Sequence, residues 1–284
     1  TSVDEHPPVL DWLAAALSLV AVSGLVFGII EGPVSGWSDP LVVGALVVGA
    51  VALVLFVVRE LRSSAPLLDP RLFRLRGFGV GSLSLTVQFF AAFGFFFLLM
   101  QYLQFVNGFT ALGAAGALLP LPFVMIPLAR QAPHIADRFG FRRVGGAGLV
   151  SMAVGFLVIS TLEVELSYPR LLVGLVFFAL GMALAGAPAT TAIVRSLPAA
   201  KQGVASAVND TSRELGSALG IAVLGSVLNQ GYRDGVASVA AALPSQLSEA
   251  VLSSIAFVTR VPAVDPRAAA VVDAGAPRTR SFLL

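Results

Sequence analysis

The sequence predicts an all-α, polytopic membrane protein with seven transmembrane helices, and both its composition and its hydropathy pattern support this class. Of the 284 residues, 57% are hydrophobic and only 12% are charged, and the mean hydropathy is +0.89. Soluble domains carry about 25% charged residues, so most of this surface must face lipid. The apolar runs are long and do not alternate in polarity, unlike the strands of a membrane barrel. Because lipid offers the backbone no hydrogen-bond partner, the spans must be helices.

Six runs without any charged residue are close to or above the length of about 20 residues that a span needs. They cover 12–30, 40–58, 77–106, 110–129, 144–162 and 171–194. The third and fourth runs form one uncharged stretch that Asn107 and Gly108 divide. The seventh run, 215–230, is too short to cross alone, so this span must extend backward through three charged residues. These are Glu214, Arg213 and Asp210.

The basic residues fix the order of these spans through the positive-inside rule. Connections after the second, fourth and sixth spans are basic, whereas those between them are acidic or neutral. The basic connections hold Arg59, Arg62, Arg71, Arg74 and Arg76, then Arg130, Arg138, Arg142 and Arg143, then Arg195 and Lys201. The basic connections are therefore expected on the cytoplasmic side.

Five parts are expected along the chain. Residues 1–11 are a linker, 12–62 a pair of transmembrane helices, and 63–76 a basic cytoplasmic loop. Residues 77–231 are expected to form a bundle of five helices, and 232–284 an irregular tail. The first residue is not Met and the last four begin an apolar segment, so we expect a piece of a longer chain.

The seventh span carries the most informative polar residues. Four of them recur at steps of three and four and so share one helical face: Ser206, Asp210, Arg213 and Ser217. Ionisable residues inside a membrane usually face a cavity and mark ion or substrate paths. Asp210 and Glu214 are therefore candidates for proton coupling, with Arg213 as their electrostatic partner and Asn209 as a substrate-binding neighbour. The alternative is a structural ion pair at the cytoplasmic mouth, and it stays open because the sequence does not fix the depth.

The connection after the fourth span is a candidate conformational clasp. It turns at Gly140, and Asp137 can interact with the positive N-terminus of the next helix. Three of its four arginines belong to the candidate clasp and can pair with carboxylates or lipid phosphates: Arg138, Arg142 and Arg143. The alternative, an ordinary positive-inside loop, accounts for the arginines but not for the Asp-Arg-x-Gly order of residues 137–140.

A substrate pocket and helix bends are expected in the middle spans. Gln88 offers hydrogen bonds near the middle of the third span, and Phe93 belongs to a run of aromatic rings that attract lipophilic cations. Simple packing or lipid contact is the alternative for the rings. Prolines break helical hydrogen bonds and allow bends, and those in the fourth and sixth spans are Pro120, Pro122, Pro127 and Pro188.

The sequence does not support an enzyme, a metal site or a cofactor site. Cysteine is absent, and the two histidines, His6 and His134, are far apart and lack ligand-type spacing. No nucleophile and base form a recognisable set. The expected partners are the lipid bilayer, a small amphipathic substrate and protons, and no nucleic acid. A non-transporting scaffold or a receptor-like seven-span protein is the alternative function.

Several segments resemble the major facilitator superfamily. Residues 137–143 are similar to the loop signature that its transporters repeat in both halves. Segments 31–37, 66–73, 101–108 and 203–220 resemble the fourteen-helix drug:proton antiporter branch. Two departures, Pro133 for a usual glycine and Phe141 for a usual basic residue, weaken the expected clasp.

The resemblance implies a partial major-facilitator fold. Residues 12–62 correspond to the two central helices, and 77–231 correspond to a C-terminal six-helix bundle that lacks its last helix. The implied function is proton-coupled multidrug efflux by alternating access, with a role in antibiotic resistance, in a bacterial cytoplasmic membrane. The implied partner is an N-terminal six-helix bundle, so we expect these residues alone not to transport.

Overall fold

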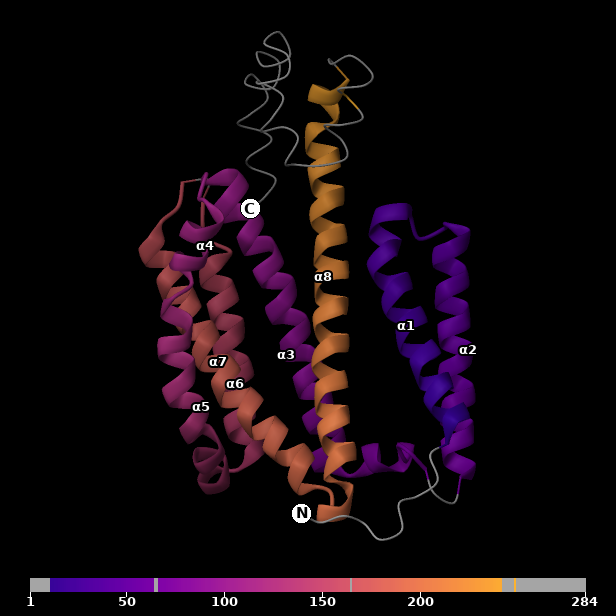
Figure 1. Ribbon diagram of the computed structural model, residues 1–284. Coiled ribbons are helices and arrows are strands. Elements are labelled where there is room, and N and C mark those ends of the chain that lie inside the picture. Colours follow the sequence, from indigo (N-terminus) through magenta and orange to yellow (C-terminus); the bar gives the residue numbers. More distant parts are fainter. Residues whose placement is uncertain (1–10, 64–65, 164, 242–247, 249–284) are drawn as a thin grey trace. The chain divides into compact units, whose positions relative to one another are not determined.

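The computed structural model describes residues 11–63, 66–163, 165–241 and 248, and the regular elements among them are all helical (Figure 1). In chain order they are α1 (Trp12–Ser35), α2 (Pro40–Arg62), η1 (Pro70–Arg74), α3 (Arg76–Gln101), the π-helix η2 (Tyr102–Val106), α4 (Ala111–Ala117), α5 (Pro120–Phe139), α6 (Phe141–Ile159), α7 (Tyr168–Arg195), η3 (Ala199–Lys201) and α8 (Gln202–Ala240). The predicted all-α class is confirmed.

Five helical stretches in the described part are long and apolar enough to cross a membrane. They are Trp12–Gly32, Pro40–Arg62, Arg76–Val106, Phe141–Ile159 and Tyr168–Arg195. Helices α4 and α5 together give a sixth, which is bent by 42°. The 39-residue α8 is not among them, because polar and charged residues lie on both sides of its apolar stretch at 215–228.

The described residues form two compact units. The first comprises residues 11–63, 66–90 and 189–222, and the second comprises residues 91–163, 165–188, 223–241 and 248. Helices α3, α7 and α8 each contribute residues to both units.

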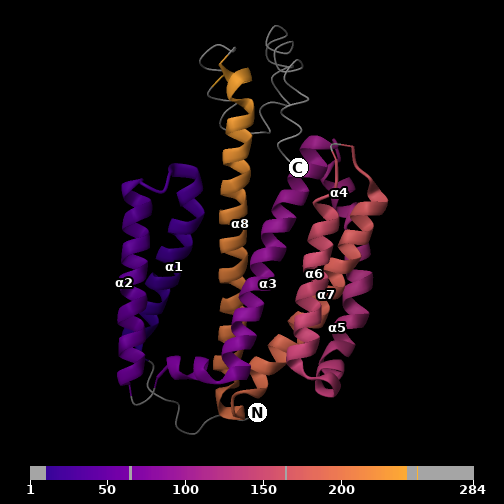
Figure 2. The same ribbon diagram turned by 180° about the vertical axis from the view of Figure 1, so that it is seen from behind.

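In the first unit, α1 and α2 form an antiparallel hairpin (Figures 1 and 2). Asp39 caps α2 by accepting from the backbone N–H of Leu41 at 2.8 Å, and Pro40 occupies the first turn, where a missing N–H costs nothing. Gly24 of α1 faces Gly49 of α2, and a Cβ on Gly24 would lie 3.0 Å from the Gly49 Cα atom. Glycine therefore allows the two backbones to approach closely, as in other membrane helix pairs.

The first half of α3 packs against the end of α7 and the start of α8 in the same unit. Gly81 lies against Ile193 and the Ala189 carbonyl of α7, at 2.8 Å and 3.0 Å from the position of a Cβ. On α8, Cβ atoms on Gly216 and Gly220 would collide with the carbonyl oxygens of Thr86 and Phe90. Both contacts advance by four residues in the same direction, so α3 and α8 run parallel.

The second unit has an aromatic core. The rings of Phe95, Phe96, Phe156 and Phe178 lie with centroids 5.2–5.6 Å apart. Such tilted and edge-on pairs add about 0.5–1.5 kcal/mol each to the burial of apolar area. The rings belong to α3, α6 and α7, so they hold these three helices together.

The structure corrects three boundaries that the sequence suggested. The fourth span, 110–129, is two helices that break before Pro120, because Pro120 and Pro122 lack the N–H groups that a continuous helix needs. The basic loop 63–76 contains the short helix η1. The tail predicted from residue 232 is helical as far as Ala240, whereas 242–247, 249–284 and most of the N-terminal linker lie outside the described residues.

Candidate functional site

The polar face of α8, which carries Asp210, Arg213 and Glu214, lies alongside α3 and not beyond its end. Extending the register of the Gly216 and Gly220 contacts backward places Asp210 beside residue 80 and Glu214 beside residue 84. These levels are about 6 Å and about 12 Å past Arg76, the first residue of α3, at the rise of an α-helix. Both acids are therefore level with a candidate membrane span and near its basic end.

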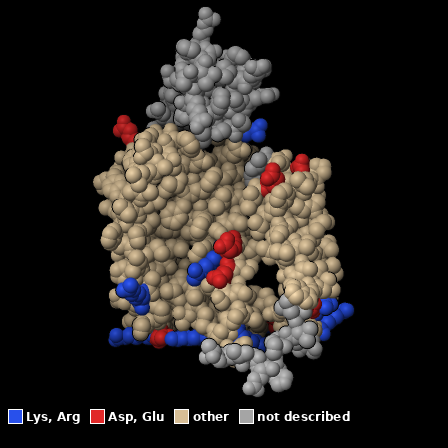
Figure 3. Space-filling model, viewed as in Figure 1, with Lys and Arg blue, Asp and Glu red and all other residues tan. Residues whose placement is uncertain are grey.

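The exposures of the charged residues on this face differ. Asp210 and Glu214 are exposed and Arg213 is half-buried, whereas Asn209 is only 7% exposed. Figure 3 shows charged side chains at both ends of the helices and one further group of acidic and basic side chains between them. Charge between the two ends is costly in a bilayer and is usually retained for ion or substrate movement.

The Arg213 guanidinium points away from the acids on its own helix. Its Nη2 donates to Thr190 Oγ1 of α7 at 3.0 Å, and its Cζ lies 5.3 Å from the centroid of the Phe89 ring. Within the described ranges it forms no salt bridge with Asp210 or Glu214, so the predicted ion pair is not formed in this structure. The reason is that a long arginine side chain can reach a hydroxyl and a ring on neighbouring helices.

Three polar atoms near this region are buried without a partner in the described structure. They are Gln88 Oε1, Asn209 Oδ1 and Arg213 Nε. Gln88 is fully buried and donates to the carbonyl and hydroxyl oxygens of Ser84 at 3.0 and 2.9 Å. Asn209 donates to Asp210 Oδ1 at 3.2 Å. Leaving such atoms unsatisfied costs about 1–3 kcal/mol each, a cost that functional sites often carry.

Phe93, the third predicted substrate-binding residue, lies apart from Gln88 and Asn209 in the division into two units. Phe93 is part of the second unit and is 42% exposed. Thr190 was missed by the sequence interpretation, although a pair of threonines at 190–191 within an apolar span was a usable signal. Phe89 belongs to the aromatic run, but its role beside Arg213 depends on how α3 and α8 pack.

The predicted clasp residues have a different setting from the loop that the sequence suggested. Helix α5 continues through Pro133 to Phe139, so Asp137 and Arg138 occupy its last turn. Only Gly140 separates α5 from α6, with a φ of 90°, and Arg142 and Arg143 begin α6 as exposed residues. Pro133 is tolerated because membrane helices re-satisfy broken backbone bonds locally.

Replacement of Gly140 by alanine is expected to destabilise the second unit by about 1–2 kcal/mol, because an L-residue is strained at positive φ. The control is Gly146→Ala in α6, where no atom lies within 4 Å of the new Cβ. Thermal unfolding in detergent should show a lower midpoint for Gly140→Ala only. Equal midpoints for both variants would contradict the assigned conformation.

The four prolines predicted to bend helices occupy different positions in their helices. Pro120 is the first residue of α5 and lies at the 42° break after α4. Pro122 is in the first turn of α5, and Pro127 and Pro188 lie inside continuous helices. The Tyr168 hydroxyl donates to the Ala117 carbonyl at 3.4 Å near the break.

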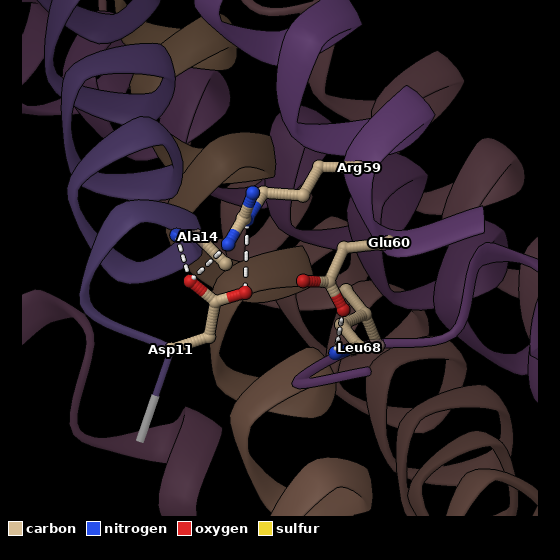
Figure 4. A network of polar contacts seen from close by, with 5 residues as sticks. All are labelled: Asp11, Ala14, Arg59, Glu60 and Leu68. Atoms are coloured by element: carbon tan, nitrogen blue, oxygen red, sulfur yellow. Dashed lines mark hydrogen bonds and ion pairs between the residues drawn. The ribbon is translucent and has the colours of Figure 1, made fainter. Parts of the chain in front are cut away.

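A second polar network joins the ends of α1 and α2 (Figure 4). Arg59 donates to both carboxylate oxygens of Asp11 at 2.8 and 2.9 Å. These bonds, together with one from the Ala14 N–H, hold the pKa of the Asp11 carboxyl below its usual range. The neighbouring Glu60 is only 2% exposed, and its Oε2 accepts from the Leu68 N–H at 2.8 Å. Sequence reasoning missed Glu60, which follows a charge-free span and looks like an ordinary helix end.

Comparison with known proteins identifies the family. The model of the Major Facilitator Superfamily matches residues 3–221. The chain belongs to this family. The family resemblance seen in the sequence motifs is thereby confirmed.

Relatives of this Major Facilitator chain include several resistance and export proteins. Multidrug resistance protein Stp of Mycobacterium tuberculosis is 35% identical over 80% of this chain and 42% of its own length. Multidrug efflux pump LfrA of Mycolicibacterium smegmatis is 33% identical over 95% and 53%. The tetracenomycin C resistance and export protein of Streptomyces glaucescens is 30% identical over 90% and 45%. The chain thus spans about half the length of the curated relatives it matches.

Family membership makes this Major Facilitator chain a multi-pass membrane protein of a transporter family and not an enzyme. Its relatives named above are bacterial. Among the described residues no cluster of side chains has the composition of a metal site.

Proposed function

We propose that the chain is the rear part of a secondary active transporter that exports drugs or other amphipathic compounds in exchange for protons. Its family and its identity of 30–35% to multidrug resistance and export proteins support this proposal. The observation that carries it is the polar face of α8 at the level of a membrane span. In this proposal 12–62 form the central pair and 77–231 the rear bundle, which works against a six-helix front bundle.

In the proposed transporter α8 is the seventh span. It follows α3 through Gly216 and Gly220 in the first unit and through Gly225, which lies against the Phe97 ring, in the second. A helix that accompanies a membrane span over this length crosses the bilayer with it. The seven-span count therefore depends on packing and not on the hydropathy of α8 alone.

In the proposed coupling, Asp210 and Glu214 bind and release the transported protons, and Arg213 changes its contacts when they do so. In this structure the guanidinium is held by Thr190 and Phe89 and not by Asp210 or Glu214. Loss of a proton creates a carboxylate within about one helical turn, and a charge in a medium of low dielectric attracts the guanidinium strongly. Exchange of the Arg213 partner would then accompany the change between inward and outward access.

The substrate would meet aromatic faces and the unsatisfied oxygens. In the first unit, Gln88 and Asn209 each present a buried acceptor, and the Phe89 ring lies beside Arg213. Phe93 belongs to the second unit and is proposed as a separate substrate contact through its exposed ring. Acceptors and rings together suit an amphipathic cation. Asp137, Arg138, Gly140, Arg142 and Arg143 are proposed to hold one access state, with bends at the four prolines named above.

Membrane vesicles that contain this chain together with the proposed front bundle, loaded with a fluorescent lipophilic cation, test the proposal. The double change Asp210→Asn and Glu214→Gln is expected to lower pH-gradient-driven transport by at least about tenfold, or about 1.4 kcal/mol. The control is Asp234→Asn, which removes another exposed acid of the same helix and should leave the rate unchanged. Gradient-driven transport that survives in the double variant would contradict the coupling role, and no gradient-driven transport in the wild type would contradict the function.

A further inference from the structure

Residues 66–76 comprise the described connection between α2 and α3 and the first residue of α3, and are called the connector below. Two contacts fix this connector to the end of α2. Buried Glu60 accepts the Leu68 N–H at 2.8 Å, and Arg71 Nη2 donates to the Leu61 carbonyl at 3.2 Å. A buried carboxylate needs hydrogen bonds to offset its loss of hydration, so this contact specifies the position of the connector. In Figures 1 and 2 the short helix of the connector runs across the ends of α2 and α3 and not along them.

The outer surface of the connector alternates apolar and basic side chains. Phe73 and Leu75 are each 45% exposed, and Arg74 and Arg76 are exposed beside them. The Phe73 ring packs edge-on against the buried ring of Phe78, with 5.1 Å between the two centroids. The exposed side chains are thus presented by a segment whose backbone is anchored.

The positive charge of the connector is not neutralised within the described structure. Its one acid, Asp69, accepts from the Arg71 N–H at 2.9 Å and caps η1. Arg74 and Arg76 form no salt bridge with any described residue. Two guanidinium groups next to two exposed apolar side chains therefore have no counter-charge on this part of the chain.

We propose that the connector is a binding surface for the headgroup of an anionic phospholipid in the cytoplasmic leaflet. Its position at the basic ends of two candidate spans is the level of the headgroups. Arg74 and Arg76 bind the phosphate, with Arg71 free to add a bond beyond the one to Leu61, and Phe73 and Leu75 enter the region of the acyl chains. This combination is the pattern of interfacial anchors that recognise anionic lipid.

The purified chain, titrated with phosphatidylglycerol or phosphatidylcholine and followed by native mass spectrometry, tests this proposal. The wild type is expected to retain phosphatidylglycerol in preference to phosphatidylcholine. The double variant Arg74→Gln, Arg76→Gln is expected to retain phosphatidylglycerol about tenfold less well. Phe73→Ser is expected to weaken retention of the same lipid.

The matched control is Arg130→Gln, Lys201→Gln, which removes two exposed basic side chains outside the connector. It tests whether any pair of basic residues has the same effect. Retention in this control should equal that of the wild type, and both double variants should keep the wild-type elution volume because all four side chains are exposed. An equal loss in both double variants, or no loss in either, would overturn the proposal, as would displacement of the lipid by millimolar inorganic phosphate.

Discussion

Replacement of Gly220 by alanine is expected to destabilise the chain by about 3 kcal/mol, at the upper end of the usual cost of overpacking. A Cβ at this position would collide with the carbonyl oxygen of Phe90 and approach the Phe90 carbonyl carbon to 2.9 Å. These atoms belong to the α3 backbone, so they cannot move aside as a side-chain end can. The parallel packing of α3 and α8 in the first unit must therefore loosen.

The measurement is thermal unfolding in detergent, followed by the loss of the monodisperse peak in size-exclusion chromatography. Gly231→Ala is the control, because it also lies in α8 and no atom lies within 4 Å of its Cβ. Alanine there should be neutral or stabilising by up to about 1 kcal/mol, since it favours helix over glycine. A Gly220→Ala protein as stable as the control would contradict the close approach.

Replacement of Arg213 by leucine is expected to abolish proton-driven transport while leaving thermal stability unchanged or higher. The side chain is half-buried, and its Nε is buried without a partner among the described residues. Replacing buried charge by apolar side chains is often neutral or stabilising, by about 1–4 kcal/mol. If Arg213 serves coupling and not the fold, Arg213→Leu must therefore lose transport without losing thermal stability.

The matching variants are Arg213→Lys and Thr190→Val. Lysine keeps the charge but not the planar guanidinium that stacks on Phe89 while donating to Thr190. We expect Arg213→Lys to transport more slowly than the wild type. Thr190→Val should have little further effect on thermal stability when it is combined with Arg213→Leu. Loss of stability in parallel with transport in Arg213→Leu would assign the residue to the fold instead.

The helical class and the positions of the spans could be predicted from sequence because each depends on local composition. Runs such as 40–58 are apolar throughout, and the arginines after Val58 mark the end of their helix at Arg62. The break before Pro120 was visible as a cluster of prolines but not as a boundary. Prolines 127 and 133 have the same chemistry and lie inside one helix, so neighbouring contacts decide which proline ends a helix.

The polar face of α8 could be found from residue spacing, but its contacts could not. Spacing suggests that Arg213 pairs with the acids three residues before it or one residue after it. The structure directs it to α3 and α7, whose contributions to the site come from residues more than 20 positions away. The role of Glu60 likewise depends on a bond to Leu68 in a segment that folds back on the end of α2.

The central claim is that α8 crosses the bilayer with its acids at the level of the other spans, and cysteine labelling from both sides tests it most directly. The natural sequence has no cysteine, so Lys201→Cys and Arg233→Cys each introduce a single reactive thiol near opposite ends of α8. In intact protoplasts, a membrane-impermeant maleimide should label Arg233→Cys. It should label Lys201→Cys only after the membrane has been permeabilised. Labelling of both positions from the same side would contradict the claim and would leave the proposed proton coupling without a membrane-spanning helix.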